Sequence, residues 1–176
     1  YLRDETWFAF CPKTYMKLAS GKGGFFDYYK QLNYGFGTDG AASSNTLNPV
    51  EQARLFGLMG KYQERNSAAY TATEIWQHLM ASHQAFPFGS GRLKEGAPAD
   101  LVIWDLYQPD TFPFYSPISA ILYSSNSQNV KYTMVAGEFL KYNGKLKIDT
   151  ETLTQEAVRL QKALLERGKG KAQVAY

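Results

Sequence analysis

NYGFGTDGAASSN, from Asn33 to Asn45, is the stretch on which the fold depends. Its apolar first half, residues 34–38, predicts a short buried strand, and the small polar residues after it predict a loop. A single acid, Asp39, stands where the strand gives way to the loop. Parallel α/β folds place catalytic groups at this end of a strand. Asp39-Gly40 is also a common turn dipeptide, so a plain turn remains the alternative.

The segments around this strand alternate in type. Residues 6–10 form a short apolar and aromatic run that predicts a second buried strand. Residues 25–32, 48–63 and 71–86 carry apolar side chains at helical spacing. Strands separated by helices predict βαβ units and therefore a parallel sheet.

The two longer helices carry N-terminal signals. Asn48 precedes Pro49 and Glu51, which predicts an N-cap, a first-turn proline and a favourable acid. Thr71 or Thr73 is expected to cap the next helix. The side chains expected to face the core from these two helices are Val50, Leu55, Leu58, Met59, Ile75, Leu79 and Met80.

The second half of the chain is rich in predicted strands. Residues 99–106 are a near-continuous apolar strand, and residues 118–125 fit either a strand or a short helix. Residues 130–147 predict a hairpin with a turn at Gly137-Glu138, and Asn143-Gly144 is a further, strong turn signal. This part of the chain is therefore expected to form a second, β-rich unit.

The two ends of the chain differ in character. The chain opens on Tyr1 rather than Met, and its first residues, Tyr1 and Leu2, are typical of the end of a helix. This start suggests either a fragment whose N-terminal portion is missing or a processed mature start. Residues 149–168 predict an amphipathic helix, whose apolar face is Leu153, Ala157, Leu160, Ala163 and Leu164.

Composition narrows the class of protein. The chain has 176 residues, of which 44% are apolar and 20% charged, as in ordinary soluble globular proteins. A net charge of +3 is too small to argue for nucleic acid. No apolar run is long enough to span a bilayer, and a signal peptide is not expected from these residues. The single cysteine, Cys11, excludes an intramolecular disulfide, so a cytoplasmic protein is predicted.

Four segments carry a family resemblance. They are CPKTYMKLASG (residues 11–21), GFGTDGAASSN (35–45), GRLKEGAPADLVIWDL (91–106) and YSPISAILYSSNSQNV (115–130). In this order and at this spacing they resemble the C-terminal part of the amidohydrolase superfamily. The branch they are most similar to holds methylthioadenosine/S-adenosylhomocysteine deaminases, guanine deaminases and triazine-type chlorohydrolases.

The resemblance implies an α/β fold that is a piece of a larger protein. Residues 1–88 would be the last two β/α units of a TIM-like (β/α)8 barrel. Residues 89–148 would be part of a small β-sandwich, which such proteins build from both ends of the chain. Residues 149–176 would be a C-terminal helix and tail. The missing N-terminal part of the same protein would then be a partner of this chain.

The resemblance also implies a chemistry for Asp39. In relatives, the acid after the eighth strand binds one divalent metal, zinc or iron, and shuttles a proton during hydrolysis of a C–N bond. A metal lowers the pKa of bound water toward neutrality, and a carboxylate beside it can take that proton and deliver it to a leaving amine. The implied substrate is a purine-like or related heterocycle. Ser43 matches a position that contacts the nucleoside, although a loop or cap hydroxyl is an equal alternative.

The chain departs from the family pattern at two places. Thr14 and Tyr15 stand where relatives have Ser-Asn, which puts the substrate in doubt. Relatives also need a His-x-His pair and two further histidines, whereas this chain has only His78 and His83. These two lie five residues apart on one predicted helix and miss the i, i+4 spacing of helical metal ligands. The remaining metal ligands are therefore expected outside this chain.

Three functions stay open from the sequence. The first is a fragment of a metal-dependent deaminase, inactive alone. The second is a dechlorinating hydrolase, which would use the same hydroxide. The third is a metal-free, non-catalytic interaction module that kept the barrel edge and the sandwich. A homo-oligomer is possible in each case, and neither nucleic acid nor membrane is an expected partner.

Overall fold

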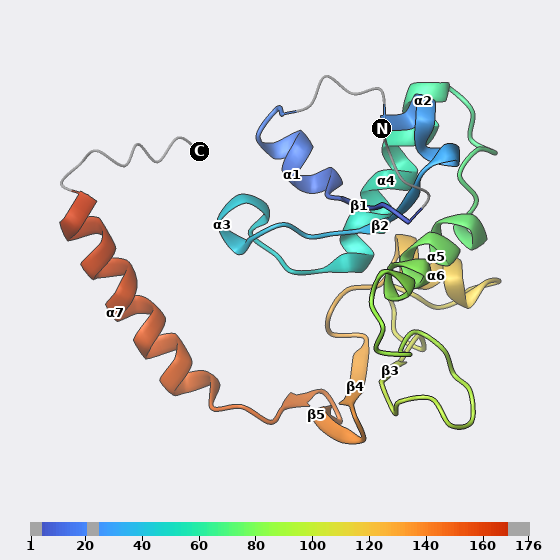
Figure 1. Cartoon of the computed structure of the whole chain (residues 1–176). Helices are drawn as coiled ribbons and strands as arrows, with labels where there is room; N and C mark the ends of the chain where they lie inside the picture. Colours follow the sequence, from blue (N-terminus) through green and yellow to red (C-terminus); the bar gives the residue numbers. More distant parts are fainter. Residues whose placement is uncertain (1–4, 21–24, 169–176) are drawn as a thin grey trace.

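A computed structural model gives the structure of residues 5–20 and 25–168 (Figure 1). The helix end expected at Tyr1 and Leu2 and the tail after residue 168 lie outside the described residues. The elements are β1 Trp7–Phe10, α1 Pro12–Lys17, α2 Phe25–Tyr28, η1 Tyr29–Gln31, β2 Asn33–Phe36, α3 Ala41–Ser44, α4 Pro49–Glu64, α5 Ala72–Ala81, η2 Ser82–Ala85, β3 Leu101–Trp104, α6 Pro117–Tyr123, β4 Val130–Val135, β5 Glu138–Tyr142, β6 Lys145–Leu146 and α7 Thr150–Gly168.

The strands β1 and β2 are parallel neighbours, as the alternation of strands and helices predicts. Their register pairs Trp7 with Asn33 and Phe10 with Phe36. The ladder continues one step further, because the Gly37 N–H donates to the Phe10 carbonyl at 2.9 Å. The carboxyl ends of the two strands therefore lie side by side, and the loops that follow them start at the same edge.

An aromatic core packs against these strands. Phe56 of α4 is fully buried at its centre. Its ring centroid lies 5.2 Å from Phe36 of β2, 5.3 Å from Tyr70 and 5.8 Å from Phe10 of β1. Tilted and edge-to-face rings at these separations attract one another beyond their burial. Part of the high aromatic content of the sequence thus holds α4 against the two parallel strands.

The N-cap predicted for α4 is confirmed. The Asn48 side chain accepts the Val50 N–H at 3.0 Å and the Glu51 N–H at 3.2 Å. The apolar face predicted for this helix is wrong in part: Val50 packs on the core, but Leu58 is 49% exposed. Leu55 and Met59 are only half-buried. The buried residues of α4 are instead Gln52, Ala53, Phe56, Gly57 and Gly60.

Glycine explains why α4 turns this face inward. A Cβ at Gly60 would lie 2.5 Å from the Tyr70 ring, and a Cβ at Gly57 would lie 2.5 Å from Cδ1 of Ile75. Neither separation is possible between real atoms. The two glycines let Tyr70 and Ile75 approach the helix backbone. The buried face of α4 is therefore the face that carries the glycines, and not the predicted apolar face.

The helix α5 confirms its predicted cap and inner face. Thr71 accepts the Glu74 N–H at 3.2 Å, while Ile75 and Leu79 are buried. The helix ends at Ala81, earlier than expected, and η2 follows it. There the Ser82 hydroxyl accepts the Phe36 N–H at 3.1 Å. This bond ties the end of α5 to the edge of β2 that faces away from β1.

The second sheet is antiparallel, in the order β3-β4-β5-β6. The predicted turn is confirmed, because Asn143 and Gly144 both adopt positive φ, 46° and 80°. The segment that fits either a strand or a helix is the helix α6, whose Ser116 cap accepts the Ser119 N–H at 3.3 Å. Arg54 of α4 donates to the Leu122 carbonyl in the last turn of α6 and, at 2.6 Å, to the Ser125 carbonyl just beyond the helix.

The helix α7 extends away from the rest of the chain (Figure 1). Asp149 caps it by accepting the Thr152 N–H at 3.0 Å. The predicted apolar face is present, but the described residues leave it uncovered: Leu153 is 57% exposed and Leu164 is 69% exposed. Within residues 5–20 and 25–168, no helix is both long and apolar enough to cross a membrane.

Candidate active site at the carboxyl ends of the parallel strands

Two loops meet at the carboxyl edge of the parallel pair. Cys11 follows β1 and leads into α1, and Asp39 follows β2 and leads into α3. The ends of the strands approach closely because residue 37 is glycine. A Cβ at Gly37 would lie 2.9 Å from the Cys11 sulfur and 3.1 Å from the Ala9 Cβ. The sequence prediction that Asp39 stands at a strand mouth is confirmed.

Asp39 has a constrained backbone and an ionised side chain. Its φ of 57° lies in the left-handed region, which a short polar residue tolerates better than a bulky one. Its Oδ1 accepts the Gly40 N–H at 2.6 Å. This bond, followed by the Ser43 and Thr14 hydroxyls, lowers the pKa of the Asp39 carboxyl below its ordinary value. The carboxylate is exposed, and within the described residues it has no ion-pair partner.

Ser43 lies in the same turn as Asp39. Its hydroxyl donates to the Gly40 carbonyl at 3.0 Å, which is the loop role that the sequence leaves open. The hydroxyl also helps to lower the pKa of Asp39, so it lies close to the carboxylate. The structure thus brings Ser43 and Asp39 together. Contact between Ser43 and a substrate stays a prediction.

The α1 helix places two further side chains beside Asp39. Thr14 is only 4% exposed, and its hydroxyl has no hydrogen-bond partner among the described residues. Tyr15 packs its ring 5.3 Å from Phe10. Burial raises the pKa of the Tyr15 hydroxyl, and the nearby Asp39 carboxylate contributes in the same direction. Thr14 and Tyr15 stand at the positions where the family pattern has Ser-Asn.

Cys11 completes the edge as a buried thiol. Its sulfur lies 3.8 Å from the Ala9 carbonyl oxygen. Burial raises the pKa of the Cys11 thiol, against a weaker opposing effect from the Asp39 backbone N–H. A neutral, buried thiol is a poor nucleophile and a poor metal ligand. Cys11 therefore packs as a small apolar side chain.

A buried amide holds the two loops in place. Gln52 of α4 is fully buried, and its Oε1 accepts the Lys13 N–H of α1 at 3.0 Å. Its Nε2 lies 3.4 Å from the Ser44 hydroxyl of α3. Gln52 therefore fixes both α1 and α3 against one helix. Sequence reasoning missed it because a glutamine inside a helix carries no apolar signal.

Charged contacts at the rim strengthen this arrangement. The Lys13 ammonium donates to the Thr46 hydroxyl at 2.9 Å and to the Glu51 carboxylate at 2.9 Å. Lys17 is exposed and donates to the Asn45 side chain. These bonds link α1 to the loop between α3 and α4.

The two histidines have partners of their own. His78 stacks on Tyr34 with 4.3 Å between ring centroids, and burial lowers the pKa of its imidazole. His83 lies 3.0 Å from the Ser90 hydroxyl. Across the described part of the chain, no group of three His, Cys, Asp or Glu side chains could hold a metal ion. Asp39 therefore fits a metal centre as one ligand and cannot complete it with these neighbours.

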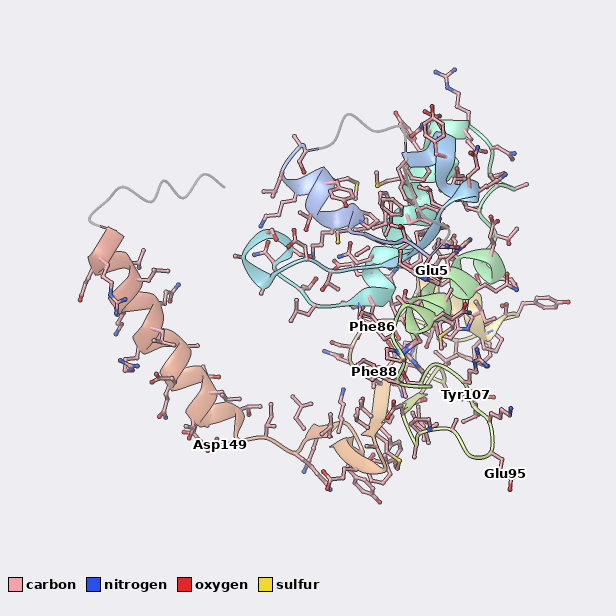
Figure 2. The ribbon with its side chains drawn as sticks, viewed as in Figure 1. Glu5, Phe86, Phe88, Glu95, Tyr107 and Asp149 are labelled. Atoms are coloured by element: carbon pink, nitrogen blue, oxygen red, sulfur yellow. The ribbon has the colours of Figure 1, made fainter. Side chains whose placement is uncertain are left out.

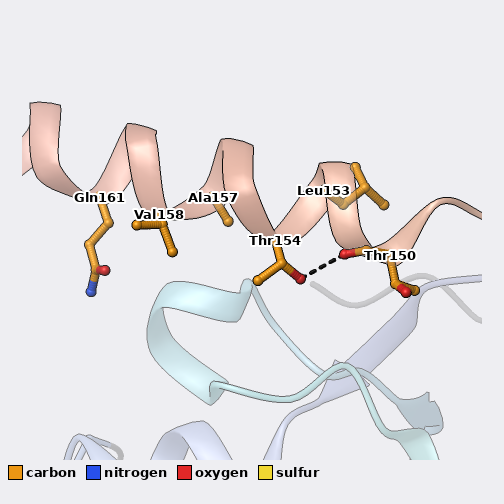
Figure 3. A pocket seen from close by; sticks show the side chains of 6 residues that line it. All are labelled: Thr150, Leu153, Thr154, Ala157, Val158 and Gln161. Carbon is orange, nitrogen blue, oxygen red and sulfur yellow. Dashed lines mark hydrogen bonds between the residues drawn. The ribbon is translucent and has the colours of Figure 1, made fainter.

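A hollow along α7 is separate from this edge (Figure 3). Its lining holds no ionisable side chain, and the Thr154 hydroxyl in it donates to the Thr150 carbonyl at 2.7 Å. An open hollow of this kind offers no acid, base or nucleophile. The strand edge, rather than this hollow, is the candidate active site.

Comparison with known proteins finds relatives that match most of this chain. The chain is 36% identical to a 5-methylthioadenosine/S-adenosylhomocysteine deaminase of Caldicellulosiruptor saccharolyticus, over 88% of this chain and 37% of the relative. It resembles the structure of an adenosine deaminase from Xanthomonas campestris with bound zinc, with a TM-score of 0.82 and 26% identity over 89% of this chain and 37% of the other.

A third likeness concerns the fold alone. The structure of atrazine chlorohydrolase from Arthrobacter aurescens, complexed with zinc, matches with a TM-score of 0.74 and 23% identity. That match covers 88% of this chain and 35% of the other. The chain thus spans a little over a third of the length of the curated relatives it matches. The sequence model of the amidohydrolase family matches residues 3–140, and the chain belongs to that family.

Proposed function

We propose that this chain supplies the Asp39 carboxylate to the active site of a metal-dependent hydrolase that removes an amino group from a purine-like heterocycle. The observation that carries the proposal is an ionised carboxylate at a strand mouth, free of any cation among the described residues, in a member of the amidohydrolase family. The relatives named as deaminases support the reaction class.

The rest of the metal centre would come from polypeptide outside this chain. A divalent metal, zinc or iron, would supply hydroxide from water near neutral pH. The zinc in two structural neighbours supports a divalent ion. Among the described residues of the strand edge, Asp39 fits as a ligand, whereas burial keeps the Cys11 thiol protonated.

Asp39 would also move the proton. Replacing an amino group by oxygen consumes one water and releases one ammonia, so one proton must pass from the water to the leaving nitrogen. A carboxylate with a lowered pKa is ionised at neutral pH and can accept this proton. Ser43 would hold the substrate beside it, since its hydroxyl lies in the same turn.

The test uses the full-length protein. Asp39→Asn keeps the size of the side chain and removes its charge, so ammonia release from 5′-methylthioadenosine, adenosine or guanine should fall by about 10²–10⁴-fold. Asp149→Asn is the matched control, because Asp149 is an exposed acid that caps α7. Full deaminase activity in the Asp39 variant would overturn the proposal.

Two other outcomes separate the alternatives. Chloride release from a chlorinated triazine, without ammonia release, would support the dechlorinating hydrolase, whose fold this chain shares. A full-length protein that binds no metal and releases neither product would support the non-catalytic interaction module. A cytoplasmic location and a homo-oligomer remain predictions from the sequence.

A further inference from the structure

Three buried hydroxyls lack a hydrogen-bond partner within the described part of the chain. They belong to Thr14, Tyr34 and Tyr123. A buried hydroxyl without a partner is unfavourable, so each requires an explanation. Tyr34 lies in the aromatic core, and the Tyr123 hydroxyl lies against α4 near Gly57. Only Thr14 lies at the strand edge that carries Asp39.

Thr14 is held firmly in this position. Its helix is tied to α4 by the bond from the Lys13 N–H to Gln52 at 3.0 Å. The Thr14 carbonyl accepts the Leu18 N–H at 2.9 Å, within the last turn of α1. These bonds hold the backbone that carries the Thr14 side chain.

Asp39 offers the partner that Thr14 lacks. Its Oδ1 is taken by the Gly40 N–H, which leaves Oδ2 for a further donor. The loop that carries Asp39 lies against the start of α1, because a Cβ at Gly37 would lie 2.9 Å from the sulfur of Cys11, which stands one helical turn before Thr14.

We propose that Thr14 is a positioning residue, whose buried hydroxyl donates to the Asp39 carboxylate and fixes its orientation during the reaction. This inference rests on the proposed function of Asp39. An anionic acceptor makes such a bond stronger than one between neutral groups. A donor behind a ligating carboxylate also orients it toward the metal, and loss of such a donor typically lowers metal affinity or activity about 10–100-fold.

Substitutions of nearly equal volume test the hydroxyl alone. Thr14→Val replaces it by a methyl group, and Thr14→Ser keeps it. In the full-length, zinc-loaded protein we expect Thr14→Val to lower kcat at least about tenfold, change KM less than about threefold, and weaken zinc in a chelator competition by about 10-fold or more. Thr14→Ser should restore each value to within about threefold of wild type.

The melting temperature separates positioning from packing. Thr14→Val removes an unpartnered buried hydroxyl, so its melting temperature should equal or exceed that of the wild type. Tyr123→Phe is the matched control: it removes another unpartnered hydroxyl, away from Asp39, and should leave kcat and zinc affinity unchanged. A residue that serves only the fold would not lose activity while keeping its stability.

The outcomes distinguish this inference from the proposed function. Wild-type kcat and zinc affinity in Thr14→Val would overturn the role of Thr14, while an active wild type would leave the deaminase standing. Equal losses in Thr14→Val and Thr14→Ser would also overturn it. If the wild type binds zinc but releases no ammonia, the deaminase fails and the zinc affinities still decide on Thr14. A wild type that binds no zinc overturns both.

Discussion

At the scale of single residues, the charges around the strand edge are balanced by short bonds. Burial alone would raise the pKa of the Glu51 carboxyl, but hydrogen bonds from Thr46 and Lys13 outweigh it and the pKa is lowered from 4.5. Lys13 and Glu51 are both mostly covered, with side chains 21% and 29% exposed. This pair is therefore better shielded from solvent than an ordinary surface ion pair.

The Glu51 site predicts a pH dependence of stability. A carboxyl with a lower pKa in the folded state stabilises the protein above its unfolded pKa, and the effect is lost as pH falls through the folded pKa. In the full-length protein, Glu51→Gln should reduce the free energy of unfolding by about 1 kcal/mol at pH 7. Near pH 3 or below, urea denaturation should show about the same stability for variant and wild type.

Glu95 provides the comparison for this experiment. It lies exposed in the loop before β3 (Figure 2), and within the described residues it forms no ion pair. Glu95→Gln should change stability little at either pH. An effect of Glu51→Gln that is equally large at pH 7 and in acid would show that packing, rather than charge, is responsible.

At the scale of elements, the packing of α4 depends on side chains that approach its backbone closely at glycine residues. Gly60→Ala should destabilise the protein by about 1–3 kcal/mol, because the new Cβ would meet the rigid Tyr70 ring at 2.5 Å. The destabilisation caused by this clash should exceed the roughly 1 kcal/mol by which alanine is more favourable than glycine inside a helix. Gly57→Ala meets the flexible end of Ile75 and should be milder. Thermal unfolding of the full-length variants checks the order, and a stabilised Gly60→Ala would contradict the packing described.

The same helices show what the sequence can and cannot predict. The cap of α4 at Asn48 and the strand mouth at Asp39 depend on neighbouring residues, so local patterns identify them. The buried face of α4 depends on which residues of other elements approach Gly57 and Gly60. Helical periodicity is read from the positions of apolar side chains. It therefore cannot predict a contact that forms because a glycine has no side chain.

The candidate site divides in the same way. Asp39 and Ser43 are visible because an acid after a strand and a loop hydroxyl are local signals. The roles of Thr14 and Gln52 cannot be predicted from local sequence. The role of Thr14 arises from a hydroxyl without a partner, and that of Gln52 from bonds between distant segments. For α6, Ser116 followed by Pro117 is a helix-start signal that would have favoured helix over strand.

At the scale of the whole molecule, large apolar surfaces lie uncovered in the described chain. Val102 and Ile103 of β3 are 52% and 50% exposed. Phe86 and Phe88 stack on each other at the surface, at 60% and 70% exposed (Figure 2). Exposed apolar side chains that lie next to one another are typical of surfaces that other protein covers. Their spread over several elements fits a large covering partner better than a small ligand.

This exposure predicts the behaviour of the 176-residue chain on its own. Because strand edges and apolar faces are open, the purified chain should self-associate, as light scattering after size exclusion would show. Co-production with the remaining part of a full-length relative should give a soluble one-to-one complex, if that part covers these surfaces.

Variants of α7 separate the two kinds of open surface. Serine at Leu153, Leu160 and Leu164 removes the apolar face of α7 without touching either sheet. If self-association persists in this triple variant, the open strand edges cause it, as expected for part of a barrel without its neighbouring strands. If self-association disappears, the apolar face of α7 causes it. A monomeric wild-type chain that unfolds cooperatively would instead mean that the two parallel strands need no neighbours, which contradicts their place in a closed barrel.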